Sequence, residues 1–113
     1  METTARHKHA RMSPTKVRKV ARMITLMALP KALDTLRVSE KRAARLIEKV
    51  VKSAWANAIE QGGRLEEDDF VVQTAKVDEG PALKRIRPGD RGRARPIRKR
   101  SCHITVVLSD RGK

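Results

Sequence analysis

Two runs of β-forming residues decide the fold: FVVQTAKV at residues 70–77 and ITVVL at residues 104–108. Both are rich in Val, Thr and other β-formers, and the first lacks the apolar spacing of an amphipathic helix, so each predicts a strand. Residues 78–103 between them contain three prolines and three glycines among many Arg and Lys. Because a structureless connection of this length is unusual in a small domain, we predict a long hairpin that continues both strands.

The turn of this hairpin is placed by symmetry. The midpoint between Phe70 and Ser109 is position 89.5, which falls on Gly89-Asp90 beside Pro88, all residue types that favour turns. About a dozen residues per strand then separate the body from the turn, and at ~3.3 Å per residue the arm reaches roughly 40 Å. A two-stranded arm is only marginally stable in water, so we expect it to acquire its shape on a partner.

The first part of the chain has the apolar spacing of amphipathic helices. Between Ser13 and Ala28 apolar residues recur at i, i+3, i+4 and i+7, with Ser13 as the expected N-cap and Pro14 in the first turn. Pro30 begins a second, short helix that ends near Val38.

The longest predicted helix begins after Ser39, which we expect to cap it, and ends at Gly62-Gly63. A wide apolar stripe runs along this helix, and its many alanines indicate close approach of neighbouring backbones. Trp55 is expected to anchor the core rather than to bind a ligand.

The charge of the chain is concentrated in two segments. Among 113 residues there are 27 Lys and Arg against 13 Asp and Glu, a formal charge of +14. Residues 1–22 and 84–100 carry +6 and +8, which is the whole of this charge, while the remaining residues balance at eleven basic against eleven acidic. Two basic segments on a neutral body indicate a polyanion-binding protein. The alternative is a pair of solvated charge runs without a partner.

Composition argues against several classes of protein. Trp55 and Phe70 are too few for a module that stacks bases on several aromatic side chains. A lone Cys102 allows no internal disulfide, which fits a reducing compartment. The charged start lacks the apolar segment of a signal peptide, and no apolar run approaches the ~20 residues of a membrane span. We therefore expect a small, soluble, intracellular domain.

The sequence contains no recognisable catalytic or metal-binding constellation. The three histidines and Cys102 lack the spacing of metal ligands. The acidic stretch from Glu66 to Asp69 has no basic or histidine partner placed with it, as a metal-dependent nuclease would need. We expect a protein that is not an enzyme and that uses neither a cofactor nor a metal.

Short motifs are spread over nearly the whole chain. They are Ala10-Arg11, Ser13-Pro14, Lys16-Val17-Arg18, Ser53-Ala54, Asn57-Ala58, Val77-Asp78-Glu79-Gly80-Pro81, Lys84-Arg85, Gly92-Arg93-Ala94, Lys99-Arg100-Ser101 and His103-Ile104-Thr105-Val106-Val107. In these motifs, and in their order, the chain resembles the bacterial large-subunit ribosomal protein L-twenty-two family. The number of motifs in the same order makes the resemblance specific.

The resemblance implies an α+β fold, with three helices packed on a small three-stranded antiparallel sheet and a long protruding basic β-hairpin arm. The third strand would be Arg6 to Ala10. The whole chain, 1–113, would form a single domain with a globular body (1–78 and 103–113) and an extended arm (79–102).

The resemblance also implies a function. It predicts a structural constituent of the large ribosomal subunit that binds ribosomal RNA, aids its assembly and lines the peptide exit tunnel with its arm. Its partners would be large-subunit ribosomal RNA, neighbouring ribosomal proteins and the nascent peptide near the arm tip, with no membrane. The location would be cytoplasmic, in the ribosome.

Charge and resemblance together predict the site residues. The tunnel tip would be Pro88, Gly89, Asp90, Arg91 and Gly92. The RNA-binding residues would be Arg6, Lys8, Arg11, Ser13, Lys16, Arg18, Lys84, Arg85, Arg87, Arg91, Arg93, Arg95, Arg98, Lys99 and Arg100.

Two segments depart from the family pattern. Thr25-Leu26-Met27 stands where the family usually has an Arg-Gly-Lys turn, and Gly89-Asp90 stands where it tends to have a basic and a small residue. Any RNA contact made by those family residues is not carried over to this chain.

The main rival interpretation is an architectural DNA-binding protein with a basic β-arm. Such proteins insert apolar wedges from their arm tips. Residues 88–92 contain one apolar side chain, that of Pro88, which disfavours this rival.

Overall fold

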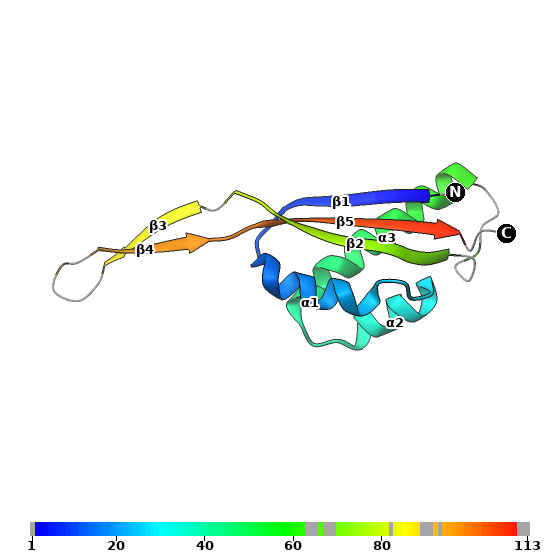
Figure 1. Ribbon diagram of the computed structural model, residues 1–113, viewed down its shortest axis with the longest axis horizontal. Helices are drawn as coiled ribbons and strands as arrows, with labels where there is room; N and C mark the ends of the chain where they lie inside the picture. The colour runs from blue at the N-terminus through cyan, green and yellow to red at the C-terminus, as the bar shows by residue number, and fades with distance from the viewer. Residues whose placement is uncertain are drawn as a thin grey trace.

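The computed structural model describes residues 2–62, 66, 70–81, 83–88, 92 and 94–110. A helical and β-sheet body carries an extended two-stranded arm, and the longest dimension is 65 Å against 25 and 16 Å for the other two (Figure 1). The elements, in chain order, are β1 (Glu2–Ala10), α1 (Pro14–Ile24), α2 (Leu29–Val38), α3 (Arg42–Gly62), β2 (Phe70–Glu79), β3 (Leu83–Pro88), β4 (Ala94–Lys99) and β5 (Cys102–Asp110).

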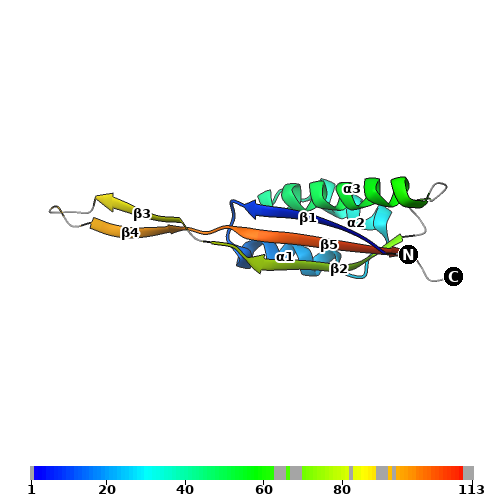
Figure 2. The same ribbon diagram turned by 90° about the horizontal axis from the view of Figure 1, so that it is seen from above.

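The body sheet has the order β1-β5-β2, and both pairings are antiparallel. All three helices lie on one face of this sheet (Figures 1 and 2). The predicted α+β class with three helices on a three-stranded antiparallel sheet is therefore confirmed. The strand expected at Arg6 to Ala10 begins earlier, at Glu2, and the other two body strands also extend beyond the predicted runs.

The core lies between the sheet and the helices. Along β5 the residues Cys102, Ile104, Val106 and Leu108 are buried while those between them are half-buried, as expected for a strand with one covered face. Alanines of α3 are buried against the sheet and the other helices, which fits the close approach predicted from composition. Trp55 is only half-buried, and its ring meets the fully buried Phe70 ring edge-on with 5.2 Å between centroids.

The first helix ends earlier than its apolar spacing predicted, at Ile24 rather than Ala28. The Leu26 N–H donates to the Val72 carbonyl at 2.7 Å, and the Val72 N–H donates to the Met27 carbonyl at 2.9 Å. The chain leaves the helix because these backbone groups pair with the edge strand β2. Tertiary pairing thus overrides the local helical pattern.

Both predicted serine caps need correction. Ser13 occupies the N-cap position of α1, but its hydroxyl makes no capping hydrogen bond. Ser39 ends α2 as its C-cap, and α3 begins three residues later at Arg42. The Ser39 hydroxyl instead accepts a hydrogen bond from the Lys41 N–H at 3.3 Å, so it orders the link between the two helices.

We predicted that the arm would continue the body strands without a break. Instead, β3 and β4 form a two-stranded sheet that is separate from the body sheet. The last body pair is Glu79 with Cys102, and the first arm pair is Leu83 with Lys99. Between these two pairs lie Gly80 and Pro81 on one side and Arg100 and Ser101 on the other. We call these four residues the joint.

The last described pair of the arm is Pro88 with Ala94. The predicted turn residues Gly89 and Asp90 lie outside the described residues.

Leu26 has an unfavourable backbone conformation. Its φ is +69°, in the left-handed region that glycine tolerates best, and its side chain is 75% exposed. The family resemblance places a glycine at this position. We expect Leu26→Gly to raise the free energy of unfolding by about 1 kcal/mol, because relief of ~1–2 kcal/mol of strain exceeds the added entropy of the unfolded chain.

Denaturant unfolding monitored by helical circular dichroism measures this change. The matched control is Met23→Gly, since Met23 is also exposed but lies inside α1. That variant should lose about 1 kcal/mol, as glycine does in a helix interior. A Leu26→Gly variant as destabilised as the control would contradict the assignment of strain.

Candidate nucleic-acid interface

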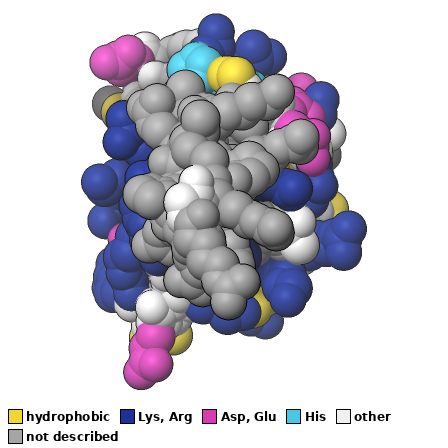
Figure 3. Space-filling model, turned by 90° about the vertical axis from the view of Figure 1, so that its left-hand side faces the viewer, with side chains coloured by type: hydrophobic (Ala, Val, Ile, Leu, Met, Phe, Trp, Pro, Cys, Tyr) yellow, Lys and Arg dark blue, Asp and Glu magenta, His cyan; other side chains and the backbone are white. Residues whose placement is uncertain are grey.

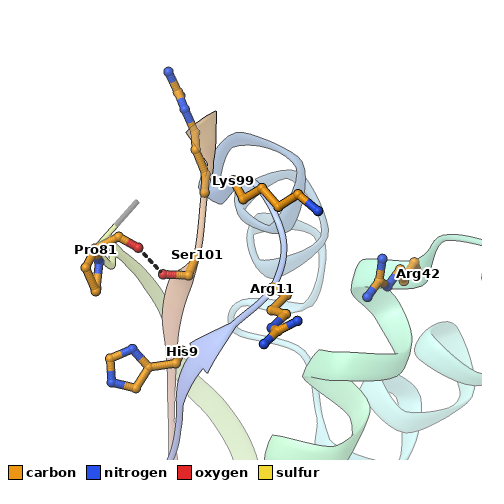
Figure 4. A pocket seen from close by; sticks show the side chains of 7 residues that line it. His9, Arg11, Arg42, Pro81, Lys99 and Ser101 are labelled. Atoms are coloured by element: carbon orange, nitrogen blue, oxygen red, sulfur yellow. Dashed lines mark hydrogen bonds between the residues drawn. The ribbon is translucent and has the colours of Figure 1, made fainter. Parts of the chain in front are cut away.

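An open groove of about 570 Å³ lies where the arm leaves the body. Residues from three separate parts of the chain surround it (Figure 4). Two come from the end of β1 and the loop after it, one begins α3, and four belong to the base of the arm. The lining residues are His9, Arg11, Arg42, Pro81, Lys99, Arg100 and Ser101.

Among the described residues, the lining of the groove has four cationic side chains and no carboxylate. Ion pairs between described side chains occur elsewhere: Arg37 with Asp34, Arg45 with Glu48 and Lys76 with Asp78. Viewed from the arm end, Lys and Arg side chains surround the base of the arm, and acidic side chains are few (Figure 3). A concave surface with one sign of charge concentrates polyanions around it.

The body side of the groove is shaped by an irregular end of β1. The register of β1 against β5 shifts between His7 and Ala10, and His9 in this irregularity has a φ of +60°. The His9 N–H donates to Nδ1 of His103 at 3.0 Å, and the two rings meet edge-on at 4.9 Å. Since that nitrogen is an acceptor, this contact uses a His103 ring without a proton on Nδ1.

The arm side of the groove is held by the joint. The Gly80 N–H donates to the Ser101 carbonyl at 3.0 Å, and the Ser101 hydroxyl donates to the Pro81 carbonyl at 2.7 Å (Figure 4). A Cβ atom on Gly80 would lie 2.6 Å from Ser101 Oγ and 3.2 Å from Cε1 of His103. A larger residue at this position would therefore displace the Ser101 hydroxyl, because the two sides of the joint approach this closely.

The structure brings three of the predicted RNA-binding residues together in the groove: Arg11, Lys99 and Arg100. Arg6, Lys8 and Lys16 have exposed side chains on β1 and α1, away from the groove lining. Five further predicted residues lie on the arm strands β3 and β4: Lys84, Arg85, Arg87, Arg95 and Arg98. Arg91 and Arg93 lie outside the described residues. Of the predicted tip, the structure describes only Pro88, which ends β3, and Gly92, with a φ of +76°.

Arg18 has a structural contact that its place in the basic segment does not reveal. Its Nε and Nη2 atoms both donate to the Val77 carbonyl, each at 3.2 Å, and the contact is partly buried. The side chain thereby ties α1 to β2. Because two of its N–H groups donate to this carbonyl, the guanidinium has fewer donors left for a phosphate.

Arg42 was not predicted as a site residue, because it lies in the charge-balanced part of the chain. The structure shows that Arg42 begins α3, where a cation opposes the helix dipole, and that the first turn has no acidic residue. The sequence did not reveal this, because the helix predicted to begin after Ser39 would have Glu40 in its first turn.

Cys102 is a core residue rather than a nucleophile. Burial raises the pKa of its thiol, and the nearby Arg18 guanidinium, which lowers it, does not outweigh burial. Within the described part of the chain, no three His, Cys, Asp or Glu side chains gather as a metal site would require. No helix in that part is both long and apolar enough to span a membrane.

A small α+β body with a projecting two-stranded arm and a cationic groove at its base defines the class of architecture, one suited to a polyanionic partner. Comparison with protein families makes the assignment specific. The family described as Ribosomal protein L22p/L17e matches residues 5–109, which is nearly the whole chain. The chain belongs to this family, and is thus a protein of the large ribosomal subunit.

Proposed function

We propose that this protein is a structural, non-catalytic constituent of the large ribosomal subunit that binds the ribosomal RNA of that subunit through its groove and arm. The observation that supports this best is the groove, whose described lining residues include four cations and no carboxylate. Family membership supports the choice of partner. The protein would hold RNA segments together during assembly of the subunit.

The chemistry of the groove suits the sugar-phosphate backbone. Arg11, Arg42 and Arg100 each offer several N–H donors in a planar fork that matches phosphate oxygens, while Lys99 supplies a point charge. Contacts of this kind fix the position of a protein on RNA but carry little sequence information. Recognition of the correct site would therefore depend on the shape of the folded RNA.

We further propose that the arm reaches into the wall of the peptide exit tunnel, as the resemblance implies. The arm is a separate two-stranded sheet that projects from the body (Figure 1). Residues 84–100 carry a charge of +8, so the arm can be stabilised by RNA on both sides. Residues 88–92 would then face the nascent peptide, and the body would contact neighbouring ribosomal proteins.

Competition between nucleic acids tests the choice of RNA over DNA. A labelled large-subunit ribosomal RNA is bound by the protein, and unlabelled ribosomal RNA or duplex DNA of equal nucleotide content is added at the same salt concentration. We expect ribosomal RNA to compete at least tenfold better, because non-specific phosphate contacts are common to both but the folded shape is not. Equal competition by duplex DNA would favour the architectural DNA-binding alternative.

A further inference from the structure

The groove and the joint are parts of one structural unit. Pro81 and Ser101, which line the groove, are also the two residues joined by the hydrogen bond across the joint. His9, on the body side of the groove, is bonded to His103, whose ring lies against Gly80. Any ligand that fills the groove therefore touches the residues that connect the arm to the body.

The cations of the groove lie on both sides of the joint and within it. Arg11 and Arg42 belong to the body, Lys99 ends β4 of the arm, and Arg100 follows it in the joint. In the free protein these like charges repel one another across the joint. Within the described part of the chain, two uncharged hydrogen bonds connect the sides of the joint, from the Gly80 N–H to the Ser101 carbonyl and from the Ser101 hydroxyl to the Pro81 carbonyl.

We propose that the groove is a phosphate clamp for an RNA strand, and that a strand seated in it fixes the direction of the arm relative to the body. The proposal rests on the proposed RNA-binding function and adds to it a coupling between two parts of the molecule. A strand bonded to Arg11 and Arg42 on one side and to Lys99 and Arg100 on the other turns repulsion across the joint into attraction. We call the joint closed when the hydrogen bonds of Gly80 and Ser101 are formed. The RNA that anchors the body then also keeps the joint closed.

The coupling is reciprocal by thermodynamic linkage. If RNA in the groove favours the closed joint by some factor, then opening the joint must weaken RNA binding by the same factor. Couplings between sites are commonly 5- to 150-fold, and about tenfold is expected from four side chains acting at the surface. Both directions can be measured.

Amide hydrogen exchange in the full-length protein measures the first direction. The probe is a short single-stranded uridine oligonucleotide, which offers phosphates without base-pairing. We expect it to slow exchange of the Gly80 amide, which donates to Ser101, by about tenfold. Exchange within α3 serves as the reference, because the stability of the body should change much less.

Charge variants on one helix separate the clamp from general electrostatics. Arg42→Ala removes a groove cation, and Lys52→Ala removes an exposed cation from the same helix outside the groove. Arg42→Ala should remove most of the added protection at Gly80, whereas Lys52→Ala should keep it. Equal behaviour of the two variants would overturn the clamp.

Substitutions in the joint measure the second direction. Gly80→Ala places a Cβ against Ser101 Oγ, so the Ser101 hydroxyl must give up its bond to Pro81. Ser101→Ala removes the same hydrogen bond without adding bulk, so it tests the joint even if Gly80→Ala does not fold. Each should weaken oligonucleotide binding by about the factor measured at Gly80, and the double variant should lose little more than either single one.

The outcomes distinguish this proposal from the general one. Oligonucleotide binding that leaves Gly80 exchange unchanged would overturn the clamp while ribosomal RNA binding still stands. An oligonucleotide that does not perturb the amides of Arg42 and Lys99 would also overturn it. Failure of the proposed function itself would be seen separately, in the competition between ribosomal RNA and duplex DNA.

Discussion

Replacing Arg93, Arg95, Arg98 and Arg100 with alanine should lower the affinity for large-subunit ribosomal RNA by roughly a hundredfold or more at low salt. Each neutralised phosphate contributes about 0.7 to 0.9 to the slope of log K against log salt concentration. The slope should therefore become flatter by roughly three units. Filter binding over a series of salt concentrations gives both quantities, and an unchanged slope would mean that this strand of the arm faces solvent in the complex.

Deletion of Pro88, Gly89 and Asp90 is the matched control for that experiment. These residues carry no positive charge, and a loop tip can vary without disturbing phosphate contacts nearby. Affinity should stay within about twofold, and incorporation into the large subunit should be nearly intact. If the tip lies in the tunnel wall, the deletion should instead change the binding of drugs to the tunnel. Loss of the protein from the subunits would show that the tip is itself an anchor.

Replacing Phe70 with alanine should produce the largest loss of stability. Phe70 is fully buried at the start of β2, and its ring contacts Trp55 of α3. Removing a buried phenyl group costs about 3–5 kcal/mol, a large part of the ~5–15 kcal/mol that stabilises a domain. Urea unfolding should show a lower midpoint with an unchanged m-value.

Ile59→Ala provides the comparison for Phe70→Ala. Ile59 lies on α3, the helix that Phe70 contacts, but its side chain is 45% exposed. Its loss should cost less than about 1 kcal/mol, since partly exposed apolar atoms leave no closed cavity. Equal effects of the two substitutions would show that Phe70 is not the centre of the core.

Much of the fold could be predicted from the sequence because helical periodicity reports which faces are buried and runs of β-forming residues indicate strands. These patterns predicted the three helices and the strands β2 and β5, whereas β1 was expected only from the family resemblance. Helix ends were less predictable, since α1 stops where Leu26 and Met27 pair with β2, a contact that no local pattern encodes. The break between body and arm was missed for a similar reason. The strand pairing stops after Glu79 with Cys102 and resumes at Leu83 with Lys99, and no local sequence pattern marks this interruption.

The candidate site was predicted in part. Clustering of charge pointed to Arg11, Lys99 and Arg100, which the fold brings to one groove. It could not identify Arg42, whose neighbours in sequence are electrically balanced and whose neighbours in space come from other elements. It also included Arg18, which the structure shows bonded to the Val77 carbonyl. A linear count of charge therefore identifies the basic segments, while the structure distinguishes which side chains are engaged within the protein.

The order of strands in the body sheet has a consequence for synthesis of the chain. β5 is the central strand and also the last one made, and β1 and β2 are hydrogen-bonded to it and not to each other. Two of the three strands therefore have no sheet partner until translation has passed residue 102. The arm, at residues 83–99, is made before that point. Closure of the sheet is a late, long-range event, and the basic segments leave the synthesising ribosome before the body that will hold them has formed.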